Sequence, residues 1–454
     1  MNIESINPAN GEVLKSYEPM SSDSVESIIA AAQNAQTEWK NISIASRSKP
    51  LMRMAELLES RAEELGRIAV LEMGKPLAEA IGEVKKCAWV CRHYAENSEA
   101  YLEPQAIESD ASSSYLRYDP LGLILAIMPW NFPFWQVFRF AAPTLMAGNG
   151  GLLKHAPNVP QCAEAIESIF VDAGFPKYLF ANLRIGTEPV AELIADPRIA
   201  AVTLTGSGRA GQAVAEAAGK ALKPVVLELG GSDPFIILED ADLDKAVSHA
   251  IISRFLNNGQ SCIAAKRLIV VEAVHDEFVE KFKVAMGTLV MGDPFAAETK
   301  IGPLAQARFR DALHQQVEAL LHEGSRCVVG GKMPDGPGNY YPATLLVDVP
   351  SESSTMKEEI FGPVASVIKV PDTKSALALA NAVDYGLGAS LWTENKSVIA
   401  EAVPKLEAGA VFVNGMVKSD PRLPFGGIKQ SGLGRELGRD GILEFVNIKT
   451  VWIA

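Results

Sequence analysis

The stretch TLTGSGRAG (Thr203–Gly211) runs from an apolar segment, through a glycine-rich turn, into residues typical of a helix start. Free backbone N–H groups at such a helix start can bind a phosphate, although a glycine loop alone is more often only a tight turn. The order of apolar strand, turn and helix recurs along the chain. Apolar runs expected to be strands cover 121–128, 151–155, 200–205, 225–230, 235–238, 267–271, 366–370 and 410–414. Their alternation with Ala-rich helical stretches predicts an α/β fold with doubly wound parallel sheets.

The two ends of the chain do not show this alternation of strands and helices. Residues 22–100 show apolar positions at helical spacing with Glu and Lys between them, which predicts helices. Residues 444–454 are typical of a strand that no helix follows. Because 454 residues exceed what one core of ordinary size holds, we expect two or three domains.

The composition is that of an ordinary soluble globular protein, with 48% hydrophobic and 21% charged residues. The chain has 42 Lys and Arg residues against 55 Asp and Glu residues, a formal net charge of −13. This acidity argues against nucleic acid and anionic membrane surfaces as partners. No apolar run reaches the roughly 18–20 residues of a membrane span, and the N-terminus lacks the basic and apolar regions of a signal peptide. We therefore expect a cytoplasmic protein.

One cysteine, Cys262, lies in the polar, turn-forming segment FLNNGQSC (Phe255–Cys262). Alone, a single Cys is more often a small core residue, but a thiol in a polar turn can ionise and act as a nucleophile. Upstream, the apolar run Pro224–Leu229 contains a lone carboxylate, Glu228, and two glycines follow it. Desolvation would raise the pKa of Glu228 and make it a general base near neutral pH. Cys262 and Glu228 are therefore a candidate nucleophile and base.

The other four cysteines, Cys87, Cys91, Cys162 and Cys327, are scattered through a long chain, which argues against a disulfide framework. Cys87 and Cys91 are four residues apart on an expected helix near His93, a spacing that a metal ion could use. Two core-facing cysteines explain the pattern better, and we expect no metal site.

Two further motifs accompany the candidate pair. MPWNFP covers Met128–Pro133, and EEIFGP covers Glu358–Pro363. Together with LELGG (227–231) and GQSC (259–262), they stand in the order MPWNFP, LELGG, GQSC, EEIFGP, and over essentially the whole chain the sequence resembles the aldehyde dehydrogenase superfamily. The resemblance implies oxidation of a small-molecule aldehyde with NAD or NADP.

The resemblance also implies a division of the chain. A cofactor-binding domain would comprise residues 1–112 and 124–230, and a catalytic domain residues 231–420. Residues 113–123 and 441–454 would form a β arm that pairs with a neighbouring subunit in this family. We therefore expect a homodimer or a homotetramer.

The expected cofactor site combines the glycine-rich turn with positions from the other motifs. By resemblance, Gly206, Ser207 and Gly211 face the pyrophosphate, and Lys154 reaches the adenosine ribose. Glu359 would hold the nicotinamide ribose. The residues expected at the cofactor are Trp130, Lys154, Pro157, Gly206, Ser207, Gly211, Glu359 and Phe361.

The adenosine end of this site departs from the family pattern. The common Lys-Pro-Ser-Glu ends in a glutamate that binds both ribose hydroxyls and repels a 2′-phosphate, whereas this chain reads Lys154, His155, Ala156, Pro157. Because the repelling carboxylate is missing, we expect a preference for NADP, with NAD also accepted. A relaxed NAD site is the alternative.

The chemistry that the resemblance implies is covalent. Cys262 attacks the aldehyde carbon, and the oxyanion of the thiohemiacetal accepts hydrogen bonds from the Asn131 amide and the backbone N–H of Cys262. After oxidation to a thioester, Glu228 activates the water that hydrolyses it. Members that pass the acyl group to coenzyme A lack a base at this place, so the expected product is a free carboxylic acid.

Substrate choice depends on the residues after Asn131. Trp135 and Arg139 lie in the segment WQVFRFAAP, and Ser419 and Arg422 lie near the C-terminus. Arg139 follows Asn131 by eight residues, about two helical turns, so we expect both on the same side of a helix. An arginine there fits a substrate carboxylate. Since WQVFRFAAP and KHAPN resemble bacterial succinate semialdehyde dehydrogenases, succinate semialdehyde is the expected substrate, with Trp135, Arg139 and Ser419 as substrate residues.

Two alternatives remain open. Arg139 could serve only to bridge helices. If the aromatic surface of Phe134 and Trp135 dominates over Arg139, a broad aldehyde dehydrogenase for uncharged aliphatic or aromatic aldehydes is favoured. A catalytically silent binding protein with the same fold is a hypothesis of another class. It is disfavoured because Cys262, Glu228, Asn131 and Glu359 are all present.

Overall fold

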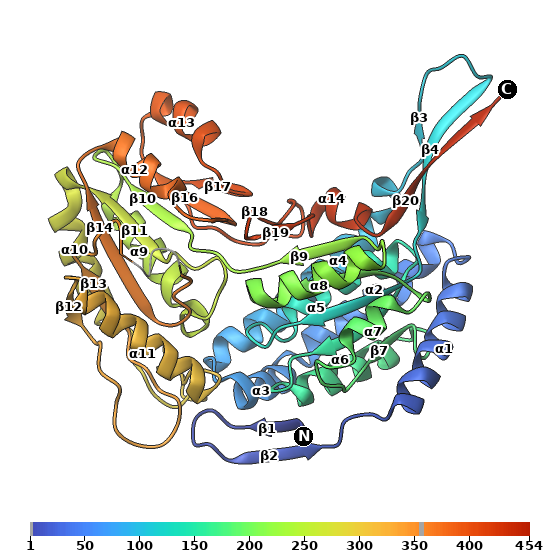
Figure 1. Cartoon of the computed structure of the whole chain (residues 1–454), viewed down its shortest axis with the longest axis horizontal. Helices are drawn as coiled ribbons and strands as arrows, with labels where there is room; N and C mark the ends of the chain where they lie inside the picture. Colours follow the sequence, from blue (N-terminus) through green and yellow to red (C-terminus); the bar gives the residue numbers. More distant parts are fainter. Residues whose placement is uncertain (1–2, 354–357) are drawn as a thin grey trace.

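The computed structural model describes residues 3–353 and 358–454, which form two sheet-containing halves and a projecting β arm (Figure 1). The chain opens with a hairpin of β1 (Ile3–Ile6) and β2 (Val13–Tyr17). Four helices follow in succession: α1 (Ser22–Trp39), α2 (Ile44–Ser60), α3 (Ala62–Met73) and α4 (Leu77–Tyr101). The prediction of helices over 22–100 is therefore confirmed.

The first half is built on a six-stranded sheet in the order β19-β9-β8-β5-β6-β7. All neighbouring strands pair in parallel except β19. The strands are β5 (Leu123–Met128), β6 (Gly150–His155), β7 (Phe180–Asn182), β8 (Ile199–Thr205), β9 (Val225–Glu228) and β19 (Gly432–Leu433). The connecting helices are α5 (Trp135–Met146), α6 (Pro160–Asp172), α7 (Val190–Ala195) and α8 (Gly208–Lys220).

Helices cover both faces of this sheet, as alternate residues of β5 show. Ile124 and Ala126 belong to a core shared with α2 to α6, whereas Leu123 and Leu125 belong to a second core shared with α1, α7 and α8. A parallel strand buried on both faces must be apolar at successive positions, which explains the sequence LILAIM.

The second half is a seven-stranded sheet in the order β12-β13-β14-β11-β10-β16-β17, parallel except for the β12–β13 pair. The strands are β10 (Pro234–Ile237), β11 (Arg267–Val271), β12 (Arg326–Val329), β13 (Thr344–Val347), β14 (Val364–Val370), β16 (Gly388–Trp392) and β17 (Ala410–Val413). The helices are α9 (Leu243–Phe255), α10 (Glu272–Met286), α11 (Ala307–His322), α12 (Thr373–Asn381) and α13 (Lys396–Ala402). Residues of α9 and α10 share one core with the sheet, and residues of α11 and α12 share the other.

The doubly wound α/β fold is thus confirmed, and the expected strand runs all contain observed strands. The expected strands do not include β16, a central member of the second sheet, because Gly388 and Ser390 interrupt its apolar pattern. The expected strand over 225–230 ends early, at Glu228, and the two glycines lie beyond it.

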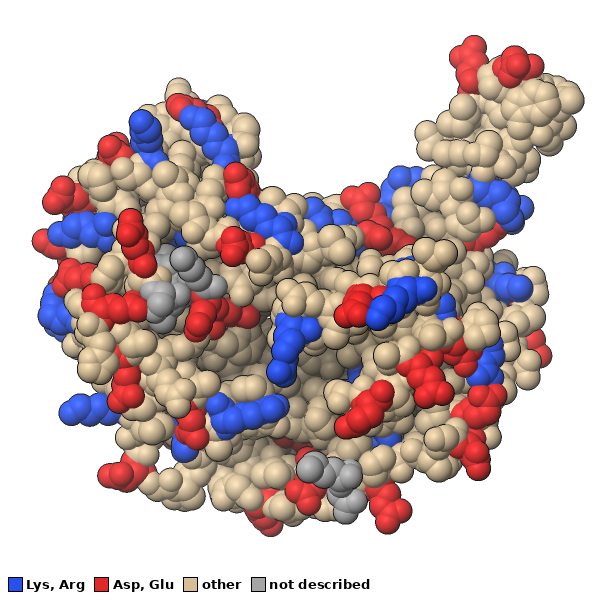
Figure 2. All heavy atoms as spheres, viewed as in Figure 1, with Lys and Arg blue, Asp and Glu red and all other residues tan. Residues whose placement is uncertain are grey.

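The arm is an antiparallel sheet of β20 (Val446–Ile453), β4 (Ser113–Pro120) and the short β3 (Gln105–Ala106). It projects from the body in Figure 1 and ends near the C-terminus. On the face drawn in Figure 2, its charged side chains gather at the tip and the base. Ile448, Trp452 and Ile453 are at least half exposed on β20. In the described part of the chain, no helix combines the length and the apolar character needed to cross a bilayer.

Candidate active site

The six-stranded sheet gathers several predicted site residues at one edge, because the carboxyl ends of its parallel strands lie side by side. The segment with Asn131 leaves β5, Lys154 lies at the end of β6, the glycine-rich turn leaves β8, and Glu228 ends β9. The β8 and β9 ends are joined directly, since Gly206 N donates to Glu228 O over 2.9 Å. Segments far apart in sequence therefore meet at one place.

The turn before Cys262 has an unusual backbone. Asn257, Asn258 and Gly259 are consecutive left-handed residues, with φ of 60°, 56° and 70°. Asparagine and glycine tolerate this region better than other residues do. Gly259 is also required for space, because a Cβ there would lie 2.3 Å from Gly362 O in the EEIFGP motif. The prediction that Cys262 follows a polar turn is confirmed, and the turn packs backbone to backbone on EEIFGP.

Hydrogen bonds join this cysteine turn to the segment with Asn131. The Asn131 amide, which is buried, donates to Gln260 O over 3.1 Å. In return Asn257 Nδ2 donates to Asn131 O and to Gln260 O, over 2.8 and 2.9 Å. The structure thereby places Asn131 beside the cysteine turn, with its amide pointing at that turn.

A buried arginine, Arg254 at the end of α9, connects the cysteine turn to EEIFGP. Its guanidinium donates to the carbonyl oxygens of Gly259, Ile360, Gly362 and Val364. Burial lowers the pKa of Arg254 to about 9. Because its four acceptors are divided between the cysteine turn and the EEIFGP segment with the start of β14, Arg254 fixes the position of one relative to the other.

Burial opposes ionisation of both candidate catalytic groups. It raises the pKa of the Cys262 thiol to about 12, and Lys266 and Arg139 act against this effect. Burial also raises the pKa of Glu228 well above its ordinary value, against the lowering influence of Arg139. Neither carboxylate oxygen of Glu228 has a hydrogen-bond partner among the described residues. Glu228 adds to the rise in the pKa of the Cys262 thiol, but no hydrogen bond joins the two groups in the described part of the chain.

The glycine-rich turn forms the start of α8. Ser207 is its N-cap, accepting from Ala210 N over 3.4 Å. A Cβ at Gly211 would lie 2.6 Å from the Leu229 side chain, so this glycine allows α8 to pack closely on the residues after β9. The free N–H groups of the first turn suit an anionic group.

The cationic side chain nearest the end of β6 is free to receive a ligand. Lys154 is only 5% exposed, yet its ammonium makes no hydrogen bond or ion pair with the described residues. Burial lowers its pKa, and Glu188 raises it. Pro157 is exposed beyond the end of the strand. A buried, unpaired ammonium fits a polar or anionic ligand such as the ribose end of a dinucleotide.

The neighbouring His155 links β6 to the segment with Asn131. His155 Nδ1 lies 2.9 Å from Ala156 N, which donates to it, and 3.3 Å from Met128 O. The shorter contact makes Nδ1 an acceptor and assigns the ring proton to Nε2, which donates to Pro133 O over 2.9 Å. Burial lowers the pKa of His155 to about 4, so the ring stays neutral. No prediction included this contact.

Aromatic rings pack together at the EEIFGP motif. Trp130 stacks on Phe309 with ring centroids 4.7 Å apart and meets Phe361 edge to face at 5.8 Å. Glu359 accepts from Gly231 N over 3.3 Å and pairs with Lys266, 2.9 Å away. The predicted cofactor residues Trp130, Glu359 and Phe361 therefore lie together.

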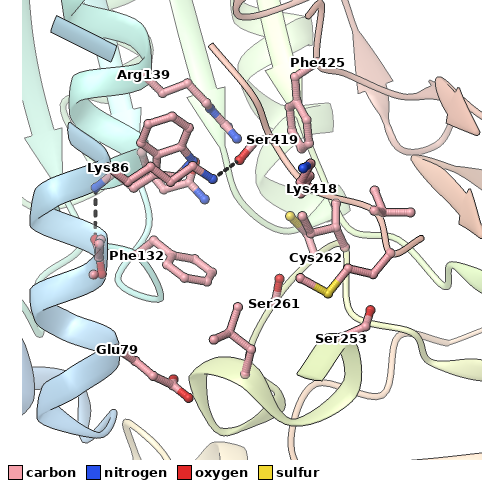
Figure 3. Close-up of a pocket in the computed structure, with 18 residues that line it drawn as sticks. Glu79, Lys86, Phe132, Arg139, Ser253, Ser261, Cys262, Lys418, Ser419 and Phe425 are labelled. Atoms are coloured by element: carbon pink, nitrogen blue, oxygen red, sulfur yellow. Dashed lines mark hydrogen bonds between the residues drawn. The ribbon is translucent and has the colours of Figure 1, made fainter. Parts of the chain in front are cut away.

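A cavity of about 290 Å³ has Cys262 in its wall (Figure 3). Its walls are largely apolar, with Phe132, Trp135 and Phe425 among them. In Figure 3, Lys86 and Arg139 lie near Ser419 at one end, and Glu79 lies at the other. The three predicted substrate residues, Trp135, Arg139 and Ser419, all line this cavity.

The structure corrects the geometry expected for Arg139. Helix α5 begins at Trp135, so Asn131 precedes the helix and the two residues are not two helical turns apart. Arg139 is 2% exposed and forms an ion pair with Glu436, which is also buried, and its Nη2 donates to Thr205 Oγ1 over 3.3 Å. Its charge at the cavity is therefore already balanced. Arg422 pairs with Asp420 and does not line the cavity.

Sequence reasoning missed a second cation in the cavity. Lys86 Nζ donates to Ser419 Oγ over 2.7 Å and lies 4.2 Å from the Trp135 ring centroid. Burial lowers the pKa of Lys86 to about 8. It shares one face of α4 with Glu79 and Glu83, at spacings of four and three residues, and that charged row was the available signal. Lys418, exposed, also lines the cavity. Cys87 and Cys91, next to Lys86, are fully buried, which confirms them as core residues.

Comparison with known proteins agrees with these observations. The aldehyde dehydrogenase family pattern matches residues 1–451. A probable NADP(+)-dependent succinate-semialdehyde dehydrogenase of Synechocystis is 54% identical, over 100% of both chains. An NADP(+)-dependent succinate-semialdehyde dehydrogenase of Mycobacterium leprae is 49% identical, also over 100% of both chains. A succinic semialdehyde dehydrogenase of Streptococcus pyogenes, solved in complex with NADP+, is 36% identical with a TM-score of 0.97 over 99% of each chain.

The match over nearly the whole length and the level of identity leave one conclusion. This chain belongs to the aldehyde dehydrogenase family.

Proposed function

We propose that this protein oxidises succinate semialdehyde to succinate with NADP+, and that it also accepts NAD+. The observation that carries the proposal is the cavity that joins Cys262 to a polar end formed by Lys86, Ser419 and Arg139. A short aldehyde with a carboxylate at its far end matches such a cavity, because the ammonium and the hydroxyl can both donate to that carboxylate. The names of the relatives at 49% and 54% identity support this substrate and this cofactor.

In the proposed reaction, the Cys262 sulfur attacks the aldehyde carbon and forms a thiohemiacetal. The Asn131 amide and the Cys262 backbone N–H stabilise the oxyanion, and Asn131 is fixed for this by its contact with the cysteine turn. The cofactor, held by Lys154, the start of α8 and Glu359, would supply the acceptor for the hydride that leaves the thiohemiacetal carbon, and the acyl group would remain on Cys262 as a thioester. Glu228, buried and without a hydrogen-bond partner among the described residues, takes a proton from the water that hydrolyses the thioester.

The residues proposed to hold the cofactor fit a dinucleotide. The start of α8 with Gly206 and Ser207 would receive the pyrophosphate, and Lys154 the adenosine ribose. Glu359 would bind the nicotinamide ribose beside Trp130. In this proposal residues 1–112 and 124–230 form the cofactor-binding domain, residues 231–420 the catalytic domain, and residues 113–123 and 441–454 an arm of a homo-oligomer.

The test is steady-state kinetics with succinate semialdehyde and butanal, each with NADP+ and NAD+. Lys86→Met removes one charge at the cavity, so kcat/KM for succinate semialdehyde should fall about 10- to 100-fold while butanal oxidation is retained. The matched control is Lys85→Met, on the exposed side of α4. Equal losses for both aldehydes, or a wild-type preference for butanal, would instead favour a broad aldehyde dehydrogenase.

Arg139 needs a different design, because its removal would leave Glu436 buried without its partner. The double variant Arg139→Met with Glu436→Gln removes both charges together. If Arg139 contributes to carboxylate binding, this double variant should lower kcat/KM for succinate semialdehyde more than for butanal. A parallel loss would mean that Arg139 serves only the ion pair.

A further inference from the structure

Lys266 is a buried cation to which the reaction outlined above assigns no role. It follows Cys262 by four residues and directly precedes β11. Its side chain is 1% exposed, and its Nζ donates to the backbone carbonyl of Cys262 over 2.5 Å. The same Nζ lies 2.9 Å from Glu359 Oε1. One ammonium therefore contacts both the cysteine turn and the EEIFGP motif.

The neighbouring Arg267 is a buried cation whose hydrogen bonds are structural, and it serves as a comparison for Lys266. Its guanidinium donates to the carbonyl oxygens of Ser232, Leu379 and Ala380, none of which belongs to the candidate site. Burying an ammonium is costly unless it is paired and hydrogen-bonded. Among the described residues, Lys266 meets that requirement with groups at the site, namely the Cys262 carbonyl and the Glu359 carboxylate.

Glu359 is oriented by the same contact. Besides Lys266, its carboxylate accepts from Gly231 N, so two donors from different segments fix it beside the residues that follow β9. A Cβ at Gly230 would lie 2.5 Å from Glu359 Oε2, which shows how closely the carboxylate approaches that backbone. Without the ammonium, the carboxylate of Glu359 would keep the 3.3 Å contact to Gly231 N as its hydrogen bond within the described part of the chain.

Four charged side chains, each from a different segment, act on the pKa of the Cys262 thiol. Lys266 and Arg139 favour its ionisation, whereas Glu359 and Glu228 oppose it. Lys266 has the largest favourable influence on the pKa of this thiol after burial is accounted for. Lys266 also acts on Asp233, a buried carboxyl next to β10 whose pKa burial raises to about 7.

We propose that Lys266 is a positioning residue that serves both halves of the site: it fixes the Glu359 carboxylate for the cofactor ribose and keeps a positive charge beside the Cys262 thiol. This rests on the proposed roles of Cys262 and Glu359. Its consequence is that one substitution should weaken cofactor binding and thiol reactivity together, although Lys266 does not line the cavity that includes Cys262.

The test uses the full-length protein without turnover. Carboxamidomethylation of Cys262 by iodoacetamide is followed against pH by peptide mass spectrometry, and the Kd of NADP+ is measured by titration. Lys266→Met should move the midpoint of the alkylation curve upward by about one pH unit and raise the Kd of NADP+ about fivefold or more. Lys266→Arg keeps the charge, so its alkylation midpoint and its Kd of NADP+ should lie close to those of the wild-type protein. Lys220→Met, on the surface of α8, is the matched control.

A second variant keeps the proposal testable if Lys266→Met does not fold. Glu359→Gln removes a charge that opposes thiol ionisation and leaves the ammonium uncompensated, so the alkylation midpoint should move downward while NADP+ binding weakens. An unchanged midpoint and Kd in folded Lys266→Met, or an upward shift in Glu359→Gln, would overturn the proposal. Failure of the proposed function is seen separately, as turnover that survives Cys262→Ala.

Discussion

At the residue scale, burial holds both proposed catalytic groups in their neutral forms, the thiol of Cys262 and the carboxyl of Glu228. Neutral resting groups mean that proton transfers must accompany the reaction. The cationic residues around them, Arg139 and Lys266, act against this effect of burial. The order of the proton transfers can be tested by separating thioester formation from hydrolysis.

Glu228→Gln should show a burst of NADPH equal to the enzyme concentration and then stall, because hydride transfer precedes hydrolysis in the proposed reaction. Cys262→Ala should bind NADP+ but give no burst. Stopped-flow absorbance of NADPH measures both. If Glu228→Gln lost the burst as well as turnover, Glu228 would be assigned to thiol activation.

The cation at the polar end of the cavity predicts a pH dependence of substrate binding. Burial lowers the pKa of Lys86 to about 8, so its ammonium is present at neutral pH and lost as the pH rises above about 8. The KM for succinate semialdehyde should therefore rise from pH 7 to 9, whereas the KM for butanal should not. Initial rates with both aldehydes across this range are the measurement, and a rise that persists in Lys86→Met would contradict the assignment.

The cofactor preference can be tested at the end of β6. Pro157→Glu should place a carboxylate near the adenosine ribose and raise the KM for NADP+ about tenfold, while the KM for NAD+ changes little. Pro157→Gln is the neutral control. The expected factor is modest because Pro157 is exposed and salt screens charges there. Unchanged NADP+ kinetics would show that residue 157 does not face the ribose.

At the element scale, the site depends on side chains that tie the ends of strands to turns. Arg254 joins the cysteine turn to EEIFGP, and Glu83 on α4 accepts from Phe134 N and Trp135 N at the start of α5. His155 fixes Pro133 O, two residues after Asn131. The segment that carries Asn131 is therefore held from two sides, by α4 and by β6.

His155→Phe keeps the ring size but removes both ring hydrogen bonds. The Pro133 carbonyl then loses its donor, a cost of about 1–2 kcal/mol, and we expect kcat to fall about tenfold as Asn131 becomes less well fixed. The Kd of NADP+ should change little. The control is His322→Phe at the exposed end of α11. A proportional loss of NADP+ binding would mean that the substitution disturbs β6 itself.

At the scale of the whole molecule, the arm exposes large apolar side chains that nothing in the same chain covers among the described residues. It projects from the body, and its strand β20 exposes Ile448, Trp452 and Ile453 (Figure 1). An exposed strand edge with large apolar side chains favours pairing with another chain. This supports the proposed homo-oligomer.

Replacing Ile448 and Trp452 by Asp together should shift the protein to a smaller assembly, because charged side chains would have to be buried in the contact. Size-exclusion chromatography with light scattering measures the molar mass. Lys449→Asp, on the same strand, separates the effect of charge from that of apolar contact. An unchanged mass in the double variant would show that the arm is not part of the interface.

Local sequence was enough to determine much of this protein. The apolar runs of β5, β8 and β11 and the helical spacing over 22–100 predict the fold, because strand and helix periodicity is a local property. The motifs around Cys262, Glu228 and Asn131 were sufficient to recognise the family, because they are short and stand in a fixed order.

Tertiary structure alone decided which charges meet. Lys86 and Ser419 are 333 residues apart in sequence, yet they share a hydrogen bond at the polar end of the cavity. Glu436 neutralises Arg139, the arginine that the sequence offered for the substrate, and Lys266 meets Glu359 from another segment. Such pairings depend on how the two sheets and the C-terminal segment pack, which no periodicity records. The short motifs therefore identify the family by resemblance, whereas the balance of charge around the cavity depends on the folded chain.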